Sequence, residues 1–154
     1  MADETASVFR PEIDVQEEIK RPRLIALLFC DWGNQTADHK HNLIGTFDRL
    51  ILRKGRTGHR FYLYVRTAET LDDPINITFF GPGGETVAGP EYRVTAEDRV
   101  PGEPVQPQLM MPFLFAPPVE GIYWVDVSYR RVSLGGAALI VEFQEEEDAD
   151  GTNT

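Results

Sequence analysis

Apolar residues recur at every second position through much of the chain, and this spacing restricts the fold more than any other feature of the sequence. In the segment FYLYVRT, Phe61, Leu63 and Val65 alternate with polar or amphipathic neighbours. Because successive side chains of a β-strand point to opposite faces, the alternation indicates a strand with one buried face. The same pattern recurs at residues 75–80, 108–115, 122–130 and 138–143.

Two earlier apolar runs, residues 24–32 and 42–52, are more continuous. Such runs are typical of strands that are covered on both faces or that cross the middle of a sheet. Pro112 has no N–H to donate to a neighbouring strand, so we expect its strand at a sheet edge or with a bulge. Clusters of glycine and proline predict turns at residues 53–59, 81–84, 101–104 and 134–137.

This pattern predicts an all-β protein, an antiparallel β-sandwich of about eight strands. The segment from Glu120 to Val125 resembles the Gly-x-Tyr-x-apolar stretch of the tyrosine corner in immunoglobulin-like sandwiches. In that corner the phenol, here that of Tyr123, bonds back to the backbone where a strand begins. Val125 stands where many such domains have a disulfide cysteine. We therefore expect an immunoglobulin-like sandwich without a disulfide.

Charge divides the chain into three parts. The net charge is −10, and seven of the excess negative charges lie in residues 1–23 and 144–154. We expect residues 1–23 to form a flexible acidic arm, residues 24–143 the sandwich and residues 144–154 a disordered acidic tail. The only helical candidate is the short stretch from Asp14 to Lys20. The negative charge argues against nucleic acid as a partner.

Neither membrane insertion nor secretion is predicted. No apolar run approaches the roughly 20 residues that span a bilayer, and the first twenty residues lack the apolar segment of a secretory signal. Cys30 is the only cysteine, so no intrachain disulfide can form. We therefore expect a cytoplasmic protein that has no membrane association and needs no cofactor.

Cys30 and Asp31 form the nearest approach to a reactive cluster, together with the nearby His39 and His41. A thiol nucleophile needs a base at hydrogen-bond distance, and a metal would take the two histidines with an aspartate. The histidines are two residues apart and would share one side of a strand. A metal-binding or thiol enzyme centred on these residues is thus an alternative function. The preferred interpretation is structural, with Cys30 as a small buried residue at a strand end.

The most basic stretch of the chain suggests a second alternative, the binding of a polyanion. Gly55 and Gly58 predict a hairpin tip within residues 53–60 that displays several positive charges together. Such a tip could bind phosphate or an acidic peptide, although a solvated hairpin that discourages edge pairing is the preferred interpretation. The charged residues concerned are Arg53, Lys54, Arg56 and Arg60.

Four aromatic residues could form a stacking surface if several of them share an outer face. They are Trp32, Tyr62, Tyr64 and Trp124. We expect at least half of them in the core or covering a sheet. Exposed aromatic residues on a sandwich with open edges would also suit a homodimer.

Cys30-Asp31 and the later segment Asn42-Leu43-Ile44-Gly45-Thr46-Phe47-Asp48 resemble a family of small uncharacterised bacterial proteins, a domain of unknown function. In that family a strand ends in Cys-Asp, and Asn-Leu-x-Gly-x-Phe-Asp and a Gly-x-Tyr strand follow. The likeness covers about residues 24–143. It implies a bacterial cytosolic β-sandwich and supplies no activity, cofactor or catalytic residue.

The function predicted from these features is that of a non-catalytic protein-binding or adaptor module. The sequence offers no secure nucleophile and base pair, metal set or nucleotide-binding loop, and sandwiches often serve recognition. Another protein is the expected partner. Trp32, Trp124 and the basic residues of 53–60 are the candidate binding residues.

Overall fold

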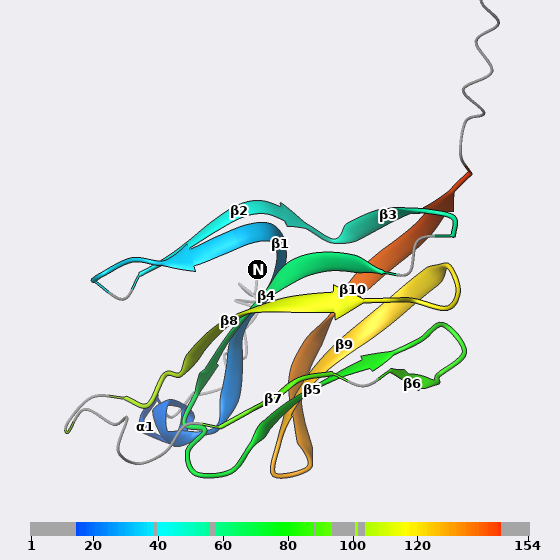
Figure 1. The fold of residues 1–154 in the computed structure, drawn as a ribbon. Coiled ribbons are helices and arrows are strands. Elements are labelled where there is room, and N and C mark those ends of the chain that lie inside the picture. Colours follow the sequence, from blue (N-terminus) through cyan, green and yellow to red (C-terminus); the bar gives the residue numbers. More distant parts are fainter. Residues whose placement is uncertain are drawn as a thin grey trace, which may run out of the picture.

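The part of the chain that the structure describes forms ten strands and one short helix (Figure 1). The computed structural model describes residues 15–38, 40–55, 58–87, 89–93, 101 and 104–145. The predicted arm and tail therefore lie largely outside the described residues. The elements are α1 (Val15–Lys20), β1 (Arg23–Gln35), β2 (His41–Phe47), β3 (Arg49–Arg53), β4 (His59–Ala68), β5 (Ile75–Phe80), β6 (Thr86–Val87), β7 (Glu91–Tyr92), β8 (Gln108–Phe115), β9 (Gly121–Tyr129) and β10 (Val132–Gln144).

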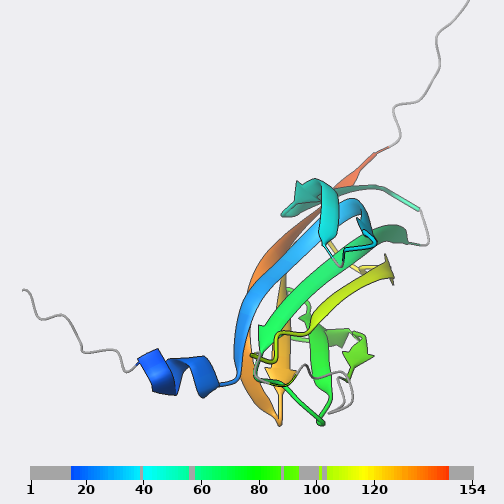
Figure 2. The ribbon, with the colours of Figure 1, turned by 90° about the vertical axis from the view of Figure 1, so that its left-hand side faces the viewer.

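The strands form two sheets that face each other as the layers of a sandwich (Figure 2). Sheet A has the order β2-β1-β4-β8, and sheet B has the order β3-β10-β9-β5-β6, with β7 also paired to β5. All pairs are antiparallel except β3 with β10, which run parallel. The predicted all-β sandwich is therefore confirmed. The helix α1 stands apart from both layers (Figure 2), and no helix in the described part of the chain is long and apolar enough to cross a membrane.

Aromatic rings from both sheets fill the space between the layers. Phe61 of sheet A lies edge-on to Phe29, Phe113 and Phe115, with ring centroids 5.8–6.2 Å apart. Phe115 in turn meets Tyr123 of sheet B edge-on at 5.2 Å. Full burial of each such side chain contributes roughly 1.5–3 kcal/mol. The alternating positions that the sequence predicted as inward-facing therefore form one core.

The predicted tyrosine corner is present at the start of β9. Tyr123 is fully buried, and its phenol donates a hydrogen bond of 2.7 Å to the carbonyl oxygen of Val119. Burial raises the pKa of this phenol, and the charge of Glu85 adds to the effect. The residue thus fixes the entry of β9 into sheet B, as in immunoglobulin-like sandwiches.

The two continuous apolar runs differ in how far they match the prediction. The run at residues 42–52 is two strands, because the chain leaves sheet A after β2 and enters sheet B as β3, with only Asp48 between them. Ile44 and Ile51 are each 57% exposed, so coverage on both faces is wrong for this run. β1 does lie between β2 and β4, but its outer face is open at Leu28 and Trp32.

The turns are confirmed in part. Residues 81–84 connect β5 to β6, and β8, which contains Pro112, is an edge strand as expected. The turn predicted at 134–137 is wrong, since these residues lie within β10 and Gly135 marks a shift of register there. The chain instead turns at Arg130 and Arg131, which both have positive φ. Arginine is an uncommon residue for such a turn, which is why the sequence did not reveal it.

Candidate binding surfaces

The basic segment 53–60 is not a hairpin tip. β3 belongs to sheet B and β4 to sheet A, so the segment crosses from one layer to the other. Arg53 alternates with the buried Leu52, and Arg60 alternates with the buried Phe61, which places the two arginines on outer faces of different sheets. The predicted common display of these charges is therefore wrong for this pair, and Arg56 lies outside the described residues.

An acidic residue also opposes the basic segment where β10 ends. The backbone N–H of Lys54 donates to the carbonyl oxygen of Gln144 at 3.1 Å, and the Lys54 ammonium lies 3.3 Å from the Glu145 carboxylate. This pair is largely exposed and contributes little to stability. It nevertheless lowers the positive potential that a polyanion would meet at the β3 end.

Cys30 is fully buried within β1 and does not end the strand, which continues to Gln35. Its thiol contacts the carbonyl oxygen of Tyr62 at 3.8 Å. Burial raises the pKa of the thiol, and the negative charge of Asp31 raises it further. A nucleophilic cysteine needs the opposite environment, one that is accessible and favours the thiolate.

His41 and Cys30 lie far apart along the β1–β2 pair. Cys30 faces Thr46 across the strands, whereas His41 faces Gln35, a separation of roughly 16 Å for five residues of strand. The His41 ring instead packs on Tyr64, with 5.4 Å between ring centroids. Within the described residues no three His, Cys, Asp or Glu side chains are grouped to hold a metal ion. His39 lies outside those residues.

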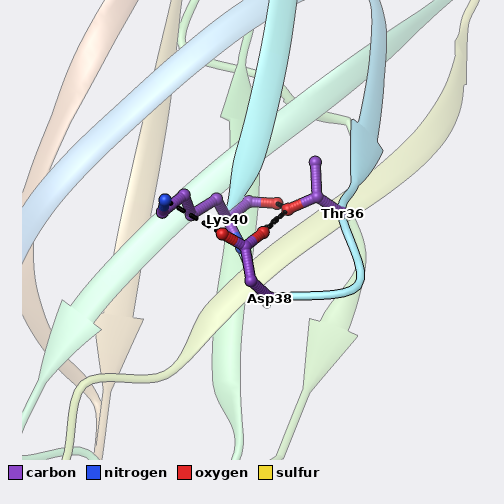
Figure 3. A network of polar contacts seen from close by, with 3 residues as sticks. All are labelled: Thr36, Asp38 and Lys40. Atoms are coloured by element: carbon purple, nitrogen blue, oxygen red, sulfur yellow. Dashed lines mark hydrogen bonds and ion pairs between the residues drawn. The ribbon is translucent and has the colours of Figure 1, made fainter.

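The tip of the β1–β2 hairpin is held by its own polar side chains (Figure 3). The Asp38 carboxylate accepts a hydrogen bond from the Thr36 hydroxyl and lies 2.9 Å from the Lys40 ammonium. Both contacts lower the pKa of Asp38, and the hydrogen bond from Thr36 has the larger effect. The contacts stabilise the tight return of the chain. Asp38 therefore serves the turn in this structure.

The four aromatic candidates do not share a face. Tyr64 is buried, and its phenol donates to the Gln108 side chain at 2.9 Å. Trp32 lies on the part of β1 that pairs only with β2, opposite Ile44, while Trp124 lies on β9 in the other sheet. A single stacking surface built from both tryptophans is therefore excluded by the topology.

A contiguous apolar surface lies on the outer side of sheet B. On β9, Ile122 and Trp124 point outward and are 62% and 46% exposed. The register places Ile122 beside Ile140, and Trp124 between Ala138 and Phe80. We call this surface the Trp124 face, made up of Phe80, Ile122, Trp124, Ala138 and Ile140.

Gly136 positions the indole ring of Trp124. A Cβ atom at this glycine would lie 2.8 Å from two carbon atoms of the ring, so the ring rests directly on the glycine backbone. The neighbouring outward position on β9 is Asp126, which accepts a hydrogen bond of 2.5 Å from the Ser133 hydroxyl. The outward residues of β9 thus change from apolar to polar along the strand.

Sequence reasoning identified Trp124 but missed the rest of this face. Ile122 and Trp124 occupy the same alternate positions as the polar Asp126 and Ser128. The presence of two large apolar residues at positions that face solvent was the signal in the sequence that could have revealed this face. The contributions of Ile140 and Phe80 require the pairing of β10 and β5 with β9, which the sequence did not predict.

Comparison with known proteins adds a fold likeness. No protein-family model matches the chain, and no curated protein matches it. The crystal structure of an immunoglobulin-like protein from Pseudomonas aeruginosa is similar, with a TM-score of 0.42 and 16% sequence identity, over 79% of this chain and 97% of that chain. The resemblance to a family of uncharacterised bacterial proteins stays a prediction.

Proposed function

We propose that the protein is a non-catalytic binding module that engages a partner protein through the Trp124 face. The observation that carries this proposal is the cluster of exposed apolar side chains around Ile122 and Trp124 on a regular sheet surface. Contiguous exposed apolar patches are uncommon on monomeric proteins and mark interaction sites. Tryptophan is also among the residues that contribute most to binding when an interface covers them.

The surroundings of the face suit an interface. An ion pair between Arg49 and Glu142 lies at its β3 side, and polar groups such as Asp126 lie at its other end. An apolar centre with a polar rim is the usual anatomy of a protein interface. Sheet B also holds Trp124 rigidly through Gly136, which reduces the conformational entropy that binding would cost.

The thiol alternative receives less support from the geometry. Cys30 is buried with a raised pKa, and the nearest described histidine in sequence packs on Tyr64. The polyanion alternative would rely on arginines that lie on different faces. Neither alternative therefore has a specific observation in its favour.

Site-specific photo-crosslinking tests the proposal. A photoreactive phenylalanine analogue replaces Ile122 in one sample of the full chain and Leu114 in another, and both samples are irradiated in cells. Leu114 is 61% exposed on sheet A, which makes it a matched control. We expect a discrete protein adduct from position 122 only, and Trp124→Glu should abolish it. Absence of an adduct at 122, or equal adducts at both positions, would refute the proposal.

A further inference from the structure

We infer that the distal part of the β1–β2 hairpin is a hinged lid over the outer face of sheet A, and that its opening uncovers Tyr64, Met110 and the thiol of Cys30. The lid comprises residues 31–38 and 40–45, and its hinge lies at Asp31 and Gly45. It is separate from the Trp124 face, which lies on the other sheet. Three features support it, namely the backbone pairing, the contacts under the hairpin and one buried atom without a partner.

The hairpin leaves sheet A immediately after Cys30. β1 pairs with β4 as far as this residue, and beyond it the described backbone of the hairpin pairs only within itself. The β1–β2 ladder lacks one bridge, that between Asp31 and Gly45. Gly45 has a φ of 67°, and the Asp31 side chain lies where a Cβ atom of Gly45 would stand. A break in the ladder at a glycine with positive φ bends the strand pair, and this bend is the hinge.

The underside of the lid packs on outward side chains of sheet A. Tyr64 and Met110 point away from the core, since each alternates with core residues of its strand. The His41 ring lies 5.4 Å from the Tyr64 ring, and a Cβ atom at Gly33 would lie 2.5 Å from the Met110 sulfur. Gly33 is buried, whereas Trp32 is 45% exposed. One side of the hairpin therefore contacts the sheet, and the other faces solvent.

The same arrangement explains why Cys30 is inaccessible. Its neighbour Phe29 belongs to the core, so the Cys30 side chain points to the outer face of sheet A. The side chain is nevertheless fully buried, and the backbone N–H groups of Trp32 and Ile44, at the base of the lid, lie close to its sulfur. Opening of the lid should therefore expose this thiol while both sheets stay folded.

Closure of the lid leaves one polar atom unsatisfied. His41 Nδ1 is buried, and no described residue provides it with a hydrogen-bond partner. A buried polar atom without a partner costs free energy relative to its hydrated state, so this nitrogen opposes closure while the contacts with Tyr64 and Met110 favour it. Opening also breaks no ladder hydrogen bond between the lid and the sheet. We therefore expect the lid to open more often than the sandwich unfolds.

Labelling of Cys30 in the full chain tests the lid. A colorimetric disulfide reagent measures the rate at several urea concentrations below the unfolding transition. Because opening of the lid exposes little surface, the rate should change less than about twofold over this range. The control, Cys30→Ala combined with Val127→Cys, carries its only thiol in the core, where Val127 is fully buried, and its rate should rise steeply with urea. An equally steep rise for Cys30 would overturn the inference.

Substitutions under the lid test the contacts that hold it closed. Met110→Ala removes the side chain that packs on Gly33 and should speed the labelling of Cys30 about tenfold. Leu114→Ala is the matched control, because Leu114 lies four residues further along the same face of β8 and is 61% exposed. Its rate should equal that of the native chain. Equal rates for Met110→Ala and Leu114→Ala would refute the lid.

A substitution at His41 tests the unsatisfied atom. His41→Leu removes the buried nitrogen and keeps an apolar contact with Tyr64, so it should slow the labelling of Cys30 about tenfold. A labelling rate at or above that of the native chain would show that this nitrogen does not oppose closure, and would overturn this part of the inference.

Discussion

The phenol of Tyr123 donates a hydrogen bond of 2.7 Å to the carbonyl oxygen of Val119, four residues earlier in the chain. The bond closes the segment that connects β8 of sheet A to β9 of sheet B. Because Tyr123 also packs edge-on against Phe115 in the core, the same residue fixes both the entry of the strand and the contact between the layers.

Tyr123→Phe should lower the free energy of unfolding by about 1–2 kcal/mol, because the substitution keeps the ring but leaves the Val119 carbonyl without its partner. Urea denaturation followed by circular dichroism measures the change. Tyr62→Phe is the matched control, since the Tyr62 phenol makes no hydrogen bond to the described residues. If Tyr62→Phe lost as much stability as Tyr123→Phe, the hydrogen bond from Tyr123 to Val119 would not have this stabilising role.

Cys30 should react with a thiol reagent roughly a hundredfold more slowly in the native protein than in the urea-unfolded chain, because the thiol is buried and reacts only after local opening. A colorimetric disulfide reagent at neutral pH measures both rates. Rapid labelling of the native protein would instead support an activated thiol.

Alkaline pH should destabilise the protein partly through Cys30. The folded state raises the pKa of the thiol, so the unfolded chain loses this proton at a lower pH than the folded protein. The contribution of Cys30 to stability is therefore complete below about pH 8.5, the thiol's unfolded value, and falls as the pH rises towards the folded pKa. Cys30→Ala should show a smaller loss of stability than the native chain between about pH 8 and 10. If the native chain and Cys30→Ala lost stability equally as the pH rises, the titration of Cys30 would not contribute to the loss.

Arg131→Gly should stabilise the protein by about 1 kcal/mol, because Arg131 has a φ of 64° in the turn between β9 and β10 and glycine adopts such angles without strain. Thermal denaturation monitors the gain. Arg130→Gly is an informative comparison, since Arg130 also has a positive φ but contacts Asp73 at 2.5 Å and lies 5.0 Å from the centre of the Tyr129 ring. The gain in stability from Arg130→Gly should therefore be smaller than that from Arg131→Gly.

Gly136→Ala should destabilise the protein by about 1–3 kcal/mol and alter the fluorescence of Trp124. The added methyl group would collide with the Val125 carbonyl and the indole ring. Gly83→Ala is the control, because the added atom would meet only the mobile end of the Glu85 side chain. Unchanged stability and fluorescence for Gly136→Ala would mean that the ring does not rest on this glycine.

Local alternation was sufficient to predict the strands but not their partners. The inward positions of β4, β5 and β9 follow directly from residues such as Phe61, Ile77 and Tyr123, because a single buried face dictates the period of two. The sheet to which each strand belongs depends on contacts between distant segments. For this reason the crossing of residues 53–60 between sheets was mistaken for a hairpin.

The candidate site was predicted only in part for the same reason. Trp124 could be selected as an aromatic residue, but its neighbours Ile140 and Phe80 join it through the pairing of three strands. Trp32, selected by the same criterion, lies on the other sheet. Residue type identified single candidates, whereas the register of the strands decided which of them form one surface.

The passage of the chain from β2 to β3 through the single residue Asp48 ties the two layers together mechanically. The Asp48 carbonyl also accepts a hydrogen bond of 2.8 Å from Ile140, which anchors the crossing point itself. A force that peels β2 away from its neighbour is therefore passed at once to β3, so that the β2 margin of sheet A and the β3 margin of sheet B cannot fray independently of each other.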